Sequence, residues 1–391
     1  MKNVTLFFLL CLMLTMNACS TYMQATCITD CNEEQKNASS FSKGPELKKL
    51  MDELTQNGVP GCTTAVYSDE GWWEYASGFS KVEDKTLMQT CNLQYLQSVS
   101  KTYMAVAILK LREQGKIDLD VSMKEYLPVK YQQYLPEIDS VTIRMLLNHT
   151  SGLPEYNFQP AYVSYLFQHP NYFFTIEELL KPIKGKKLQF KPGSKHVYTN
   201  TNYTLLALIA DSLTGDHAKF IAENIFQPLQ LTNTFYRNDT GYLRYTTIPN
   251  SYWDRYSNSI LENVSVMQRR NVSTLIGDDG IVCTPSDAVK FLKGLMEGKL
   301  LSPASLKEME QWVNDKNGNP IYGLGLIHHS FNGHTAIGHS GGGIGAGCEL
   351  YYFPEKNLYF FVAINIGTVT DSPLHAKLSK IKDDLWATLV K

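Results

Sequence analysis

The 391-residue chain lacks a strong charge of either sign, a long apolar run and a recognisable metal-binding motif. Its 36 Lys and Arg nearly balance its 38 Asp and Glu, so a formal net charge of −2 argues against a nucleic acid partner. The apolar stretch at residues 4–16 is too short to span a bilayer comfortably. Neither Cys-x-x-Cys nor His-Glu-x-x-His occurs, which disfavours zinc.

What the chain has is enough apolar sequence for one large core or two lobes, since 43% of its residues are hydrophobic. No internal repeat is evident. The periodicity predicts an α+β fold, in which both chain ends form a sheet lobe flanked by helices and the middle forms a mostly helical lobe, about 98–277. The expected elements are helices at 45–57 and 98–113, strands at 62–68, 72–78, 322–329, 348–353 and 358–366, and a closing helix after Pro373.

The first residues are typical of an export signal. Lys2 precedes a short apolar stretch, and Met16-Asn17-Ala18-Cys19 resembles a bacterial lipobox in which Cys19 becomes lipidated. We expect residues 1–18 to be a signal peptide, 19–43 a polar tether and 44–391 the folded domain. The predicted location is therefore outside the cytoplasm, in the periplasm or anchored to a membrane through Cys19; secretion after Ala18 without lipid is the alternative.

Six cysteines remain beyond the signal and the expected cleavage site. An exported protein permits disulfides, but six cysteines allow about 15 connectivities. Cys283 and Cys348 fall in segments expected to border a site, so they could pair, although the sequence does not show it.

Ser-x-x-Lys occurs three times, at Ser40, Ser98 and Ser379, and a lone match is weak. Ser40 lies in the tether, and Ser379 lies among lysines on an expected solvated face. Only Ser98 begins an apolar helix, with Lys101 one turn later. The spacing places both side chains on one face, whereas Ser100 points elsewhere and is expected to serve packing. A structural N-cap is the alternative role for Ser98.

Three further motifs follow in order: LLNHTSGLP (146–154), Tyr198-Thr199-Asn200, and His339-Ser340-Gly341 within IGHSGGGIGAG. Together with Ser98-x-x-Lys101 this pattern resembles the penicillin-recognising serine hydrolases. It resembles in particular the branch of class C β-lactamases, D-alanyl-D-alanine carboxypeptidases, D-aminopeptidases and some esterases. The resemblance runs from about residue 44 to the end and includes 115–128 and 278–292, which match stretches that border the family's site.

The resemblance implies a role for each matching residue. Ser98 is the expected nucleophile and Lys101 the base that activates it, because a serine hydroxyl attacks poorly until a base takes its proton. Tyr198 is expected to relay a proton to the leaving group. Asn200 is expected to bind the substrate amide. Tyr198 and Asn200 are two apart, so an extended segment would place them on one face.

The third motif is expected on an inner strand at the edge of the cleft. The backbone N–H groups of Ser98 and Gly342 would form the oxyanion hole, and the glycines at 341–343, Gly341 included, would let substrate approach the backbone. His339 stands where class C β-lactamases usually have lysine. Histidine there is more typical of the peptidase and esterase relatives, where it could still hydrogen-bond a substrate carboxylate.

Two further segments lie near these motifs. His149 is expected to be structural, because the family uses this loop to shape the floor of the site. The aromatic run at 156–174 predicts either a pocket wall or lid, or ordinary packing of the helical lobe.

Other readings compete with this one. Gly338-His339-Ser340-Gly341-Gly342 also fits the nucleophile elbow Gly-x-Ser-x-Gly, with Asp371 and His375 downstream, but an elbow needs a following helix and a strand is predicted there. The glycines loosely match a dinucleotide-binding loop and fail the same test of context. A third alternative is a binding or sensor module that has lost catalysis.

The predicted function is that of an exported serine hydrolase acting through a Ser98 acyl-enzyme on peptides or amides with D-amino acids, without metal or organic cofactor. Ester or β-lactam hydrolysis is the alternative activity. The sequence does not specify an oligomeric state.

Overall fold

A computed structural model describes residues 41–236 and 247–391. Its central feature is a nine-stranded antiparallel sheet in which the first strands of the chain pair with the last. In spatial order the strands are β3 (Thr86–Leu87), β2 (Gly71–Lys81), β1 (Gly61–Ser68), β14 (Leu358–Ile364), β13 (Gly347–Phe353), β12 (His334–Gly342), β11 (Ile327–Phe331), β10 (Pro320–Tyr322) and β9 (Val313–Asn314). The predicted sheet lobe built from both chain ends is confirmed.

The two faces of this sheet carry different cores because side chains alternate along each strand. In β14, Phe360 and Val362 belong to the core beneath the terminal helices, whereas Phe361 and Ala363 face the remainder of the protein. The terminal helices are α1 (Gly44–Gln56) and α12 (Pro373–Val390), which contact each other. On the opposite face, α10 (Pro285–Met296) crosses β14 and β1.

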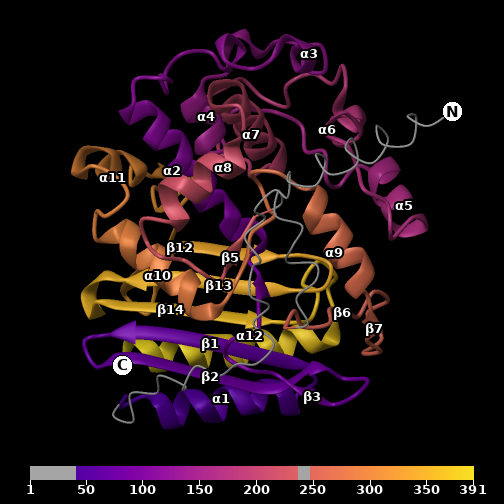
Figure 1. Cartoon of the computed structure of the whole chain (residues 1–391), viewed down its shortest axis with the longest axis vertical. Helices are drawn as coiled ribbons and strands as arrows, with labels where there is room; N and C mark the ends of the chain where they lie inside the picture. Colours follow the sequence, from indigo (N-terminus) through magenta and orange to yellow (C-terminus); the bar gives the residue numbers. More distant parts are fainter. Residues whose placement is uncertain (1–40, 237–246) are drawn as a thin grey trace, which may run out of the picture.

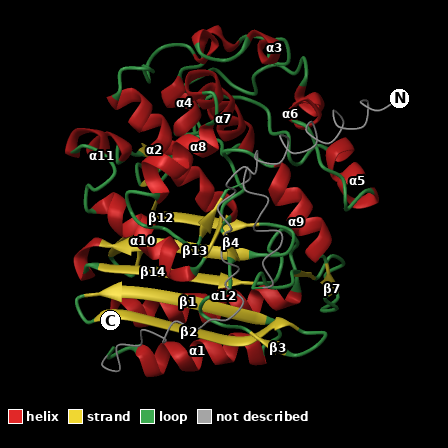
Figure 2. Ribbon diagram, in the orientation of Figure 1, coloured by secondary structure: helices red, strands yellow, loops and turns green. Residues whose placement is uncertain are grey.

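A second lobe, mostly helical, continues from this second face. Figure 2 shows most of the other helices at one end of the molecule and the large sheet, with α1, α10 and α12 beside it, at the other. The buried helix α2 (Ser100–Glu113) runs at its centre beside α7 (Asn200–Thr214). The other helices are α3 (Val129–Gln132), α4 (Ile143–Leu147), α5 (Pro160–Gln168), α6 (Ile176–Leu180), α8 (His217–Ile221), α9 (Ser265–Thr274) and α11 (Pro303–Met309) (Figure 1).

Two small sheets contain the remaining described strands. The first consists of β4 (Gln94–Tyr95), β8 (Val282–Cys283) and β5 (Thr234–Phe235), and it joins the approach to α2 to the segment after α9. The second is the pair β6 (Tyr252–Trp253) and β7 (Glu262–Asn263). Within residues 41–236 and 247–391, no helix is both long and apolar enough to cross a bilayer.

Two expectations about boundaries change. The polar tether was expected to end at residue 43, but Phe41 is already part of the folded domain, because its side chain is buried and stacks on Trp73. The strand expected at 322–329 is two strands, since the chain turns between β10 and β11, where Gly325 has a φ of +77°. The signal peptide and Cys19 lie outside the described residues.

Candidate active site

Ser98 lies in a tight turn rather than in the α-helix predicted to start there. Residues Gln97–Val99 form a 3₁₀ turn, η1, and α2 begins at Ser100. No side-chain capping bond is made at the start of α2, so Ser98 does not serve as a helix cap. Ser98 instead lines a cleft, and its Oγ accepts a hydrogen bond of 2.9 Å from Lys101 Nζ. The predicted pairing of these two side chains is therefore present.

Lys101 is fully buried and its Nζ has three hydrogen-bond acceptors. Besides Ser98 Oγ, it donates to Asn200 Oδ1 at 2.8 Å and to the backbone oxygen of Asp278 at 2.9 Å. These contacts hold the amine against the serine and connect three segments of the chain. Ser100, in contrast, is buried and its Oγ accepts from the N–H of Ile281, as its predicted packing role requires.

Tyr198 and Asn200 both reach this site, but not along one extended strand as expected. Thr199 is extended, but Asn200 is already the first residue of α7. The Tyr198 ring lies with its centroid 5.0 Å from Lys101 Nζ. Burial raises the pKa of Tyr198, and the nearby charge of Lys101 opposes this rise, so the phenol keeps its proton at neutral pH.

His149 supports the Tyr198 segment from behind. It is fully buried, and its ring lies 4.2 Å from that of Tyr198, centroid to centroid. Its Nδ1 accepts from the N–H of Thr199 and lies 3.1 Å from Asn202 Nδ2. These contacts match the structural role that the sequence indicated.

Sequence reasoning missed three carboxylic acids that line the cleft. Glu155 accepts the N–H groups of Asn200 and Asn157. Asp278 accepts from Tyr156 and Thr204 through its side chain. The sequence did contain a signal for two of these acids, because Asp278 and Asp279 begin the segment 278–292 that was already expected to border the site.

Asp279 is the third of these acids, and among the described residues its carboxyl accepts only the N–H of the next residue, Gly280. Burial raises the pKa of Asp278 to about 6, although the charge of Lys101 opposes this rise. Burial, with added repulsion from Asp278, raises the pKa of Asp279 to about 7. The carboxyl of Asp279 therefore gains or loses its proton close to neutral pH.

The predicted oxyanion donors, the backbone N–H groups of Ser98 and Gly342, belong to residues that both line the cleft. Gly342 ends β12, whose pairing with β11 stops at Gly338, so the edge of β12 beyond that point is not covered by β11. The neighbouring glycines also leave room for protein. A Cβ on Gly341 would lie 2.4 Å from the backbone oxygen of Leu96, and one on Gly343 would lie 2.5 Å from Gln97 Oε1. The absence of side chains at both positions therefore admits the nucleophile's own turn.

His339 lies behind the cleft wall rather than in it. It is 1% exposed, its Nε2 lies 3.0 Å from Tyr322 Oη, and its Nδ1 lies 2.6 Å from the backbone oxygen of Ser340. Burial and, secondly, the charge of Lys101 lower the pKa of His339 to about 3. The imidazole is therefore neutral at physiological pH. This placement gives no support to the expected contacts of His339 and Gly341 with substrate.

The cleft has a volume of about 570 Å³ and lies between the helical lobe and the β12 end of the sheet. Part of the aromatic run 156–174 forms one wall of this cleft. The predicted pocket wall is therefore present for those residues of the run that line the cleft. Phe158, Tyr162, Val163, Leu166 and Phe167 line the cleft, whereas Tyr156 and Phe174 pack in the core. No described group of three His, Cys, Asp or Glu side chains could hold a metal ion.

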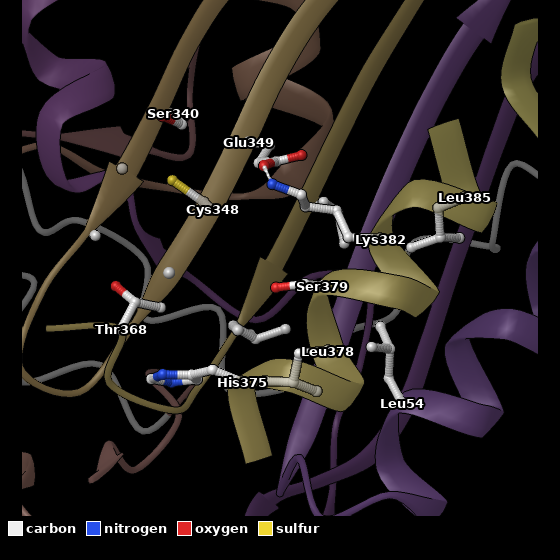
Figure 3. Close-up of a pocket in the computed structure, with 15 residues that line it drawn as sticks. Leu54, Ser340, Cys348, Glu349, Thr368, His375, Leu378, Ser379, Lys382 and Leu385 are labelled. Carbon is white, nitrogen blue, oxygen red and sulfur yellow. Dashed lines mark ion pairs between the residues drawn. The ribbon is translucent and has the colours of Figure 1, made fainter. Parts of the chain in front are cut away.

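A second cavity, of about 420 Å³, lies on the opposite face of β12 beneath α12 (Figure 3). Ser340 and Ser379 both line this cavity. Lys382, the lysine of the Ser379-x-x-Lys382 match, forms an ion pair with Glu349. His375 Nε2 bonds to the backbone oxygen of Gly367.

The segment after Ser340 is a β-hairpin, since Gly342 pairs with Gly347. Both the nucleophile elbow and the dinucleotide loop require a helix after the glycines, so neither alternative fits.

The structure answers a question about the cysteines that the sequence left open. Cys283 and Cys348 are both free and buried, so they do not pair with each other. The Cys348 thiol instead donates to the backbone oxygen of Leu96, and Cys91 is disulfide-bonded.

Comparison with known proteins agrees with this geometry. Residues 47–380 match the Beta-lactamase family. Penicillin-binding protein 4* of Bacillus subtilis (strain 168) is 28% identical over 315 residues, which are 77% of this chain and 67% of that protein. Protein flp of Staphylococcus aureus (strain N315) is 25% identical over 206 residues, which are 52% of this chain and 40% of that protein.

Solved structures give the same fold. A D-stereospecific amidohydrolase from Streptomyces sp. has a TM-score of 0.73 at 23% identity, covering 85% of this chain and 97% of its own. The D-amino acid amidase from Ochrobactrum anthropi SV3, complexed with L-phenylalanine amide, has a TM-score of 0.76 at 21% identity, covering 89% and 98%. Because the family match spans most of the sequence and the serine–lysine pair is in contact, this chain is a serine hydrolase and belongs to the Beta-lactamase family.

Proposed function

We propose that the protein hydrolyses amides and short peptides with a D-amino acid at the scissile bond, through an ester on Ser98. The observation that carries this proposal is the 2.9 Å contact between Lys101 Nζ and Ser98 Oγ in a cleft that Tyr198 and Gly342 also line. A nucleophile, a base and a proton donor are thereby gathered around one point where a carbonyl carbon can sit.

The first half of the reaction forms the ester. Lys101 reacts from its unprotonated form and takes the hydroxyl proton as Ser98 Oγ attacks the carbonyl carbon. The N–H groups of Ser98 and Gly342 stabilise the oxyanion, where one such donor is worth about 2.7–4 kcal/mol of barrier. The C–N bond then breaks. The Tyr198 phenol donates a proton to the leaving amine and recovers one from Lys101.

The second half reverses these proton movements. A water molecule loses a proton to the basic side chains as it attacks the ester carbonyl, and Ser98 Oγ regains a proton as the acid is released. Asn200 is positioned to bind the substrate amide through its Nδ2, since its Oδ1 accepts from Lys101.

Two observations favour amides over β-lactams. The amidase and the D-stereospecific amidohydrolase share this fold over almost their whole length. In addition, the described residues that line the cleft include Glu155, Asp278 and Asp279 but no Lys, Arg or His, which is unfavourable for a substrate carboxylate. Ester hydrolysis is the second candidate, because the aromatic wall favours apolar substrates without requiring charge.

We also propose that the protein acts outside the cytoplasm, anchored through a lipid on Cys19. Support comes from the sequence of residues 1–19. Mass spectrometry of the mature N-terminus is the test: an unmodified Cys19 would exclude the anchor.

The activity itself is tested with four substrate classes at equal enzyme concentration: D-aminoacyl amides, D-Ala-D-Ala peptides, p-nitrophenyl esters and nitrocefin. We expect the D-amides to have the highest kcat/KM and the L-amides to be much poorer. Labelling of Ser98 by a fluorophosphonate, located by peptide mass spectrometry, shows that the acylating serine is intact. Labelled enzyme without turnover of any D-substrate would refute the proposed substrate class.

A further inference from the structure

The two oxyanion donors belong to separate segments of the chain. The N–H of Ser98 lies in the turn η1, and that of Gly342 lies at the end of β12. In an antiparallel hairpin, the N–H groups of successive residues point to opposite sides of the strand. Gly343 donates across the hairpin to the backbone oxygen of Ala346, so the N–H of Gly342 points the other way, to the edge that β11 leaves uncovered. The position of this donor therefore depends on what holds the strand end.

Packing alone is a weak constraint on Gly342. This residue lines the cleft on one side and the second cavity on the other, so its peptide lies between two spaces. It also stands between Gly341 and Gly343, and glycine gives the backbone more conformational freedom than any other residue. An oxyanion donor is effective only when it is already in place before the reaction begins. The strand end therefore needs a support from another segment.

Thr368, in the segment after β14, makes two hydrogen bonds to this strand end. Its N–H donates to the backbone oxygen of Gly343 at 2.9 Å, and its Oγ1 accepts the N–H of Gly343 at 3.2 Å. A Cβ on Gly342 would lie 2.6 Å from the same Oγ1, and a Cβ on Gly347 would lie 2.6 Å from Cγ2 of Thr368. The absence of side chains at these two glycines therefore lets Thr368 lie directly against both strands of the hairpin.

The residue before Thr368 is itself held on both sides. The N–H of Gly367 donates to the backbone oxygen of Tyr252 in β6 at 2.7 Å, and its oxygen accepts from His375 Nε2 in α12 at 3.0 Å. Figure 3 shows Thr368 and His375 on the wall of the second cavity. Thr368 therefore connects the glycine-rich hairpin to two elements outside the cleft.

We propose that Thr368 is a positioning residue for acylation, which holds Gly342 so that its N–H points at the oxyanion. This inference rests on the proposed function in one respect, the assignment of that N–H to the oxyanion, and it is independent of the substrate class. On the other face of β12, the nucleophile's own turn packs against Gly341 and Gly343. The end of β12 is thus held between the nucleophile's turn and Thr368, which fixes the distance between the two oxyanion donors.

The experiment separates the hydroxyl of Thr368 from its shape. Thr368→Val keeps the branched side chain and loses the acceptor, whereas Thr368→Ser keeps the acceptor. The matched control is Thr175→Val, because Thr175 is also exposed and its Oγ1 accepts a backbone N–H, that of Glu178, at 3.3 Å in the capping box of α6.

Fluorophosphonate labelling of Ser98 is measured over a range of probe concentrations, with urea unfolding on the same samples. Saturation separates the maximal labelling rate from the half-saturating concentration. The phosphoryl oxygen of the probe occupies the place of the oxyanion during attack, so the maximal rate reports on the two N–H donors.

Thr368→Val should lower the maximal labelling rate about five- to fiftyfold, which is part of the roughly 10²–10³-fold that removal of one oxyanion donor costs. The half-saturating concentration should stay within about twofold, because the donor acts on the transition state more than on the bound probe. Thr368→Ser should label within about threefold of the native rate, since serine offers the same hydroxyl acceptor. Thr175→Val should label at the native rate although it loses a helix cap and unfolds at a lower urea concentration.

Native labelling by folded Thr368→Val would overturn the inference, as would a Thr368→Ser protein that is as slow as Thr368→Val. A change confined to the half-saturating concentration would also overturn it, because it would describe binding of the probe and not the oxyanion. If Thr368→Val does not fold, Thr368→Ala, which also lacks the acceptor, is judged by the same criteria. Failure of the proposed function has a different result, in which labelling depends on Thr368 but no D-substrate is hydrolysed; a native protein that does not label at Ser98 would overturn both.

Discussion

Replacing Lys101 with methionine should remove acylation while keeping the volume of the side chain. The lysine Nζ is the only described donor to Ser98 Oγ, at 2.9 Å, so the variant leaves the serine without a base. General-base assistance contributes about 10²–10⁴-fold, and we expect the labelling rate of Ser98 to fall by that factor. At about 1.36 kcal/mol for each factor of ten, the activation barrier rises by roughly 3–5.5 kcal/mol.

The same change should affect stability through the other two acceptors. Asn200 Oδ1 and the backbone oxygen of Asp278 are held at 2.8 and 2.9 Å by Lys101, and both residues are buried. Leaving a buried acceptor unpaired costs about 1–3 kcal/mol, so the two together cost roughly 2–6 kcal/mol. Removing a buried amine from the core offsets part of this loss, so the free energy of unfolding should decrease by less than the sum.

The assay is the time course of fluorophosphonate adduct formation, followed by intact mass, with urea unfolding measured on the same samples. Lys382→Met is the matched control, because Lys382 is the lysine of another Ser-x-x-Lys match and is half-exposed in an ion pair with Glu349. Labelling of folded Lys101→Met at the native rate would refute the assigned base. Loss of labelling in Lys382→Met would point to the wrong serine–lysine pair.

Three other outcomes follow from the geometry. Ser98→Ala should abolish acylation, whereas Ser100→Ala should retain it and lose about 1–3 kcal/mol of stability by unpairing a buried N–H; loss of labelling in folded Ser100→Ala would contradict this. Because burial lowers the pKa of His339 to about 3, the unfolded chain binds a proton there that the native state does not, and stability should fall as pH drops below about 6.5; His339→Gln should lose less stability between pH 7 and 4 by urea unfolding. Gly341→Ala places a Cβ 2.4 Å from the oxygen of Leu96, so it should slow acylation by shifting the nucleophile's turn, and an unchanged labelling rate would argue against this coupling.

The sequence predicted what depends on local spacing and motif order. A separation of three positions between Ser98 and Lys101 places both side chains on one face whether the turn is α or 3₁₀, so the predicted contact is present although the helix starts later than expected. The short runs of apolar and β-branched residues in β1 and β14 likewise predicted strands, and the two chain ends supplied one sheet. Tyr198 and Asn200 reach the site although the local conformation at Asn200 is helical.

The sequence could not predict which faces meet. In the sequence, Gly341 and Gly343 indicate only that something approaches the backbone closely. The structure shows that Leu96 and Gln97 of the nucleophile's own turn do so.

By itself, then, the sequence determined the family, the serine–lysine pair and the overall division into sheet and helical lobes, because these depend on residue type and short spacing. The tertiary structure decided that His339 is neutral behind the wall, that Cys283 and Cys348 stay unpaired, and that Asp279 and Gln97, which has a φ of +49°, line the cleft. Burial and charge at these positions arise from segments far apart in the chain. Their electrostatic effects depend on distances that exist only after folding.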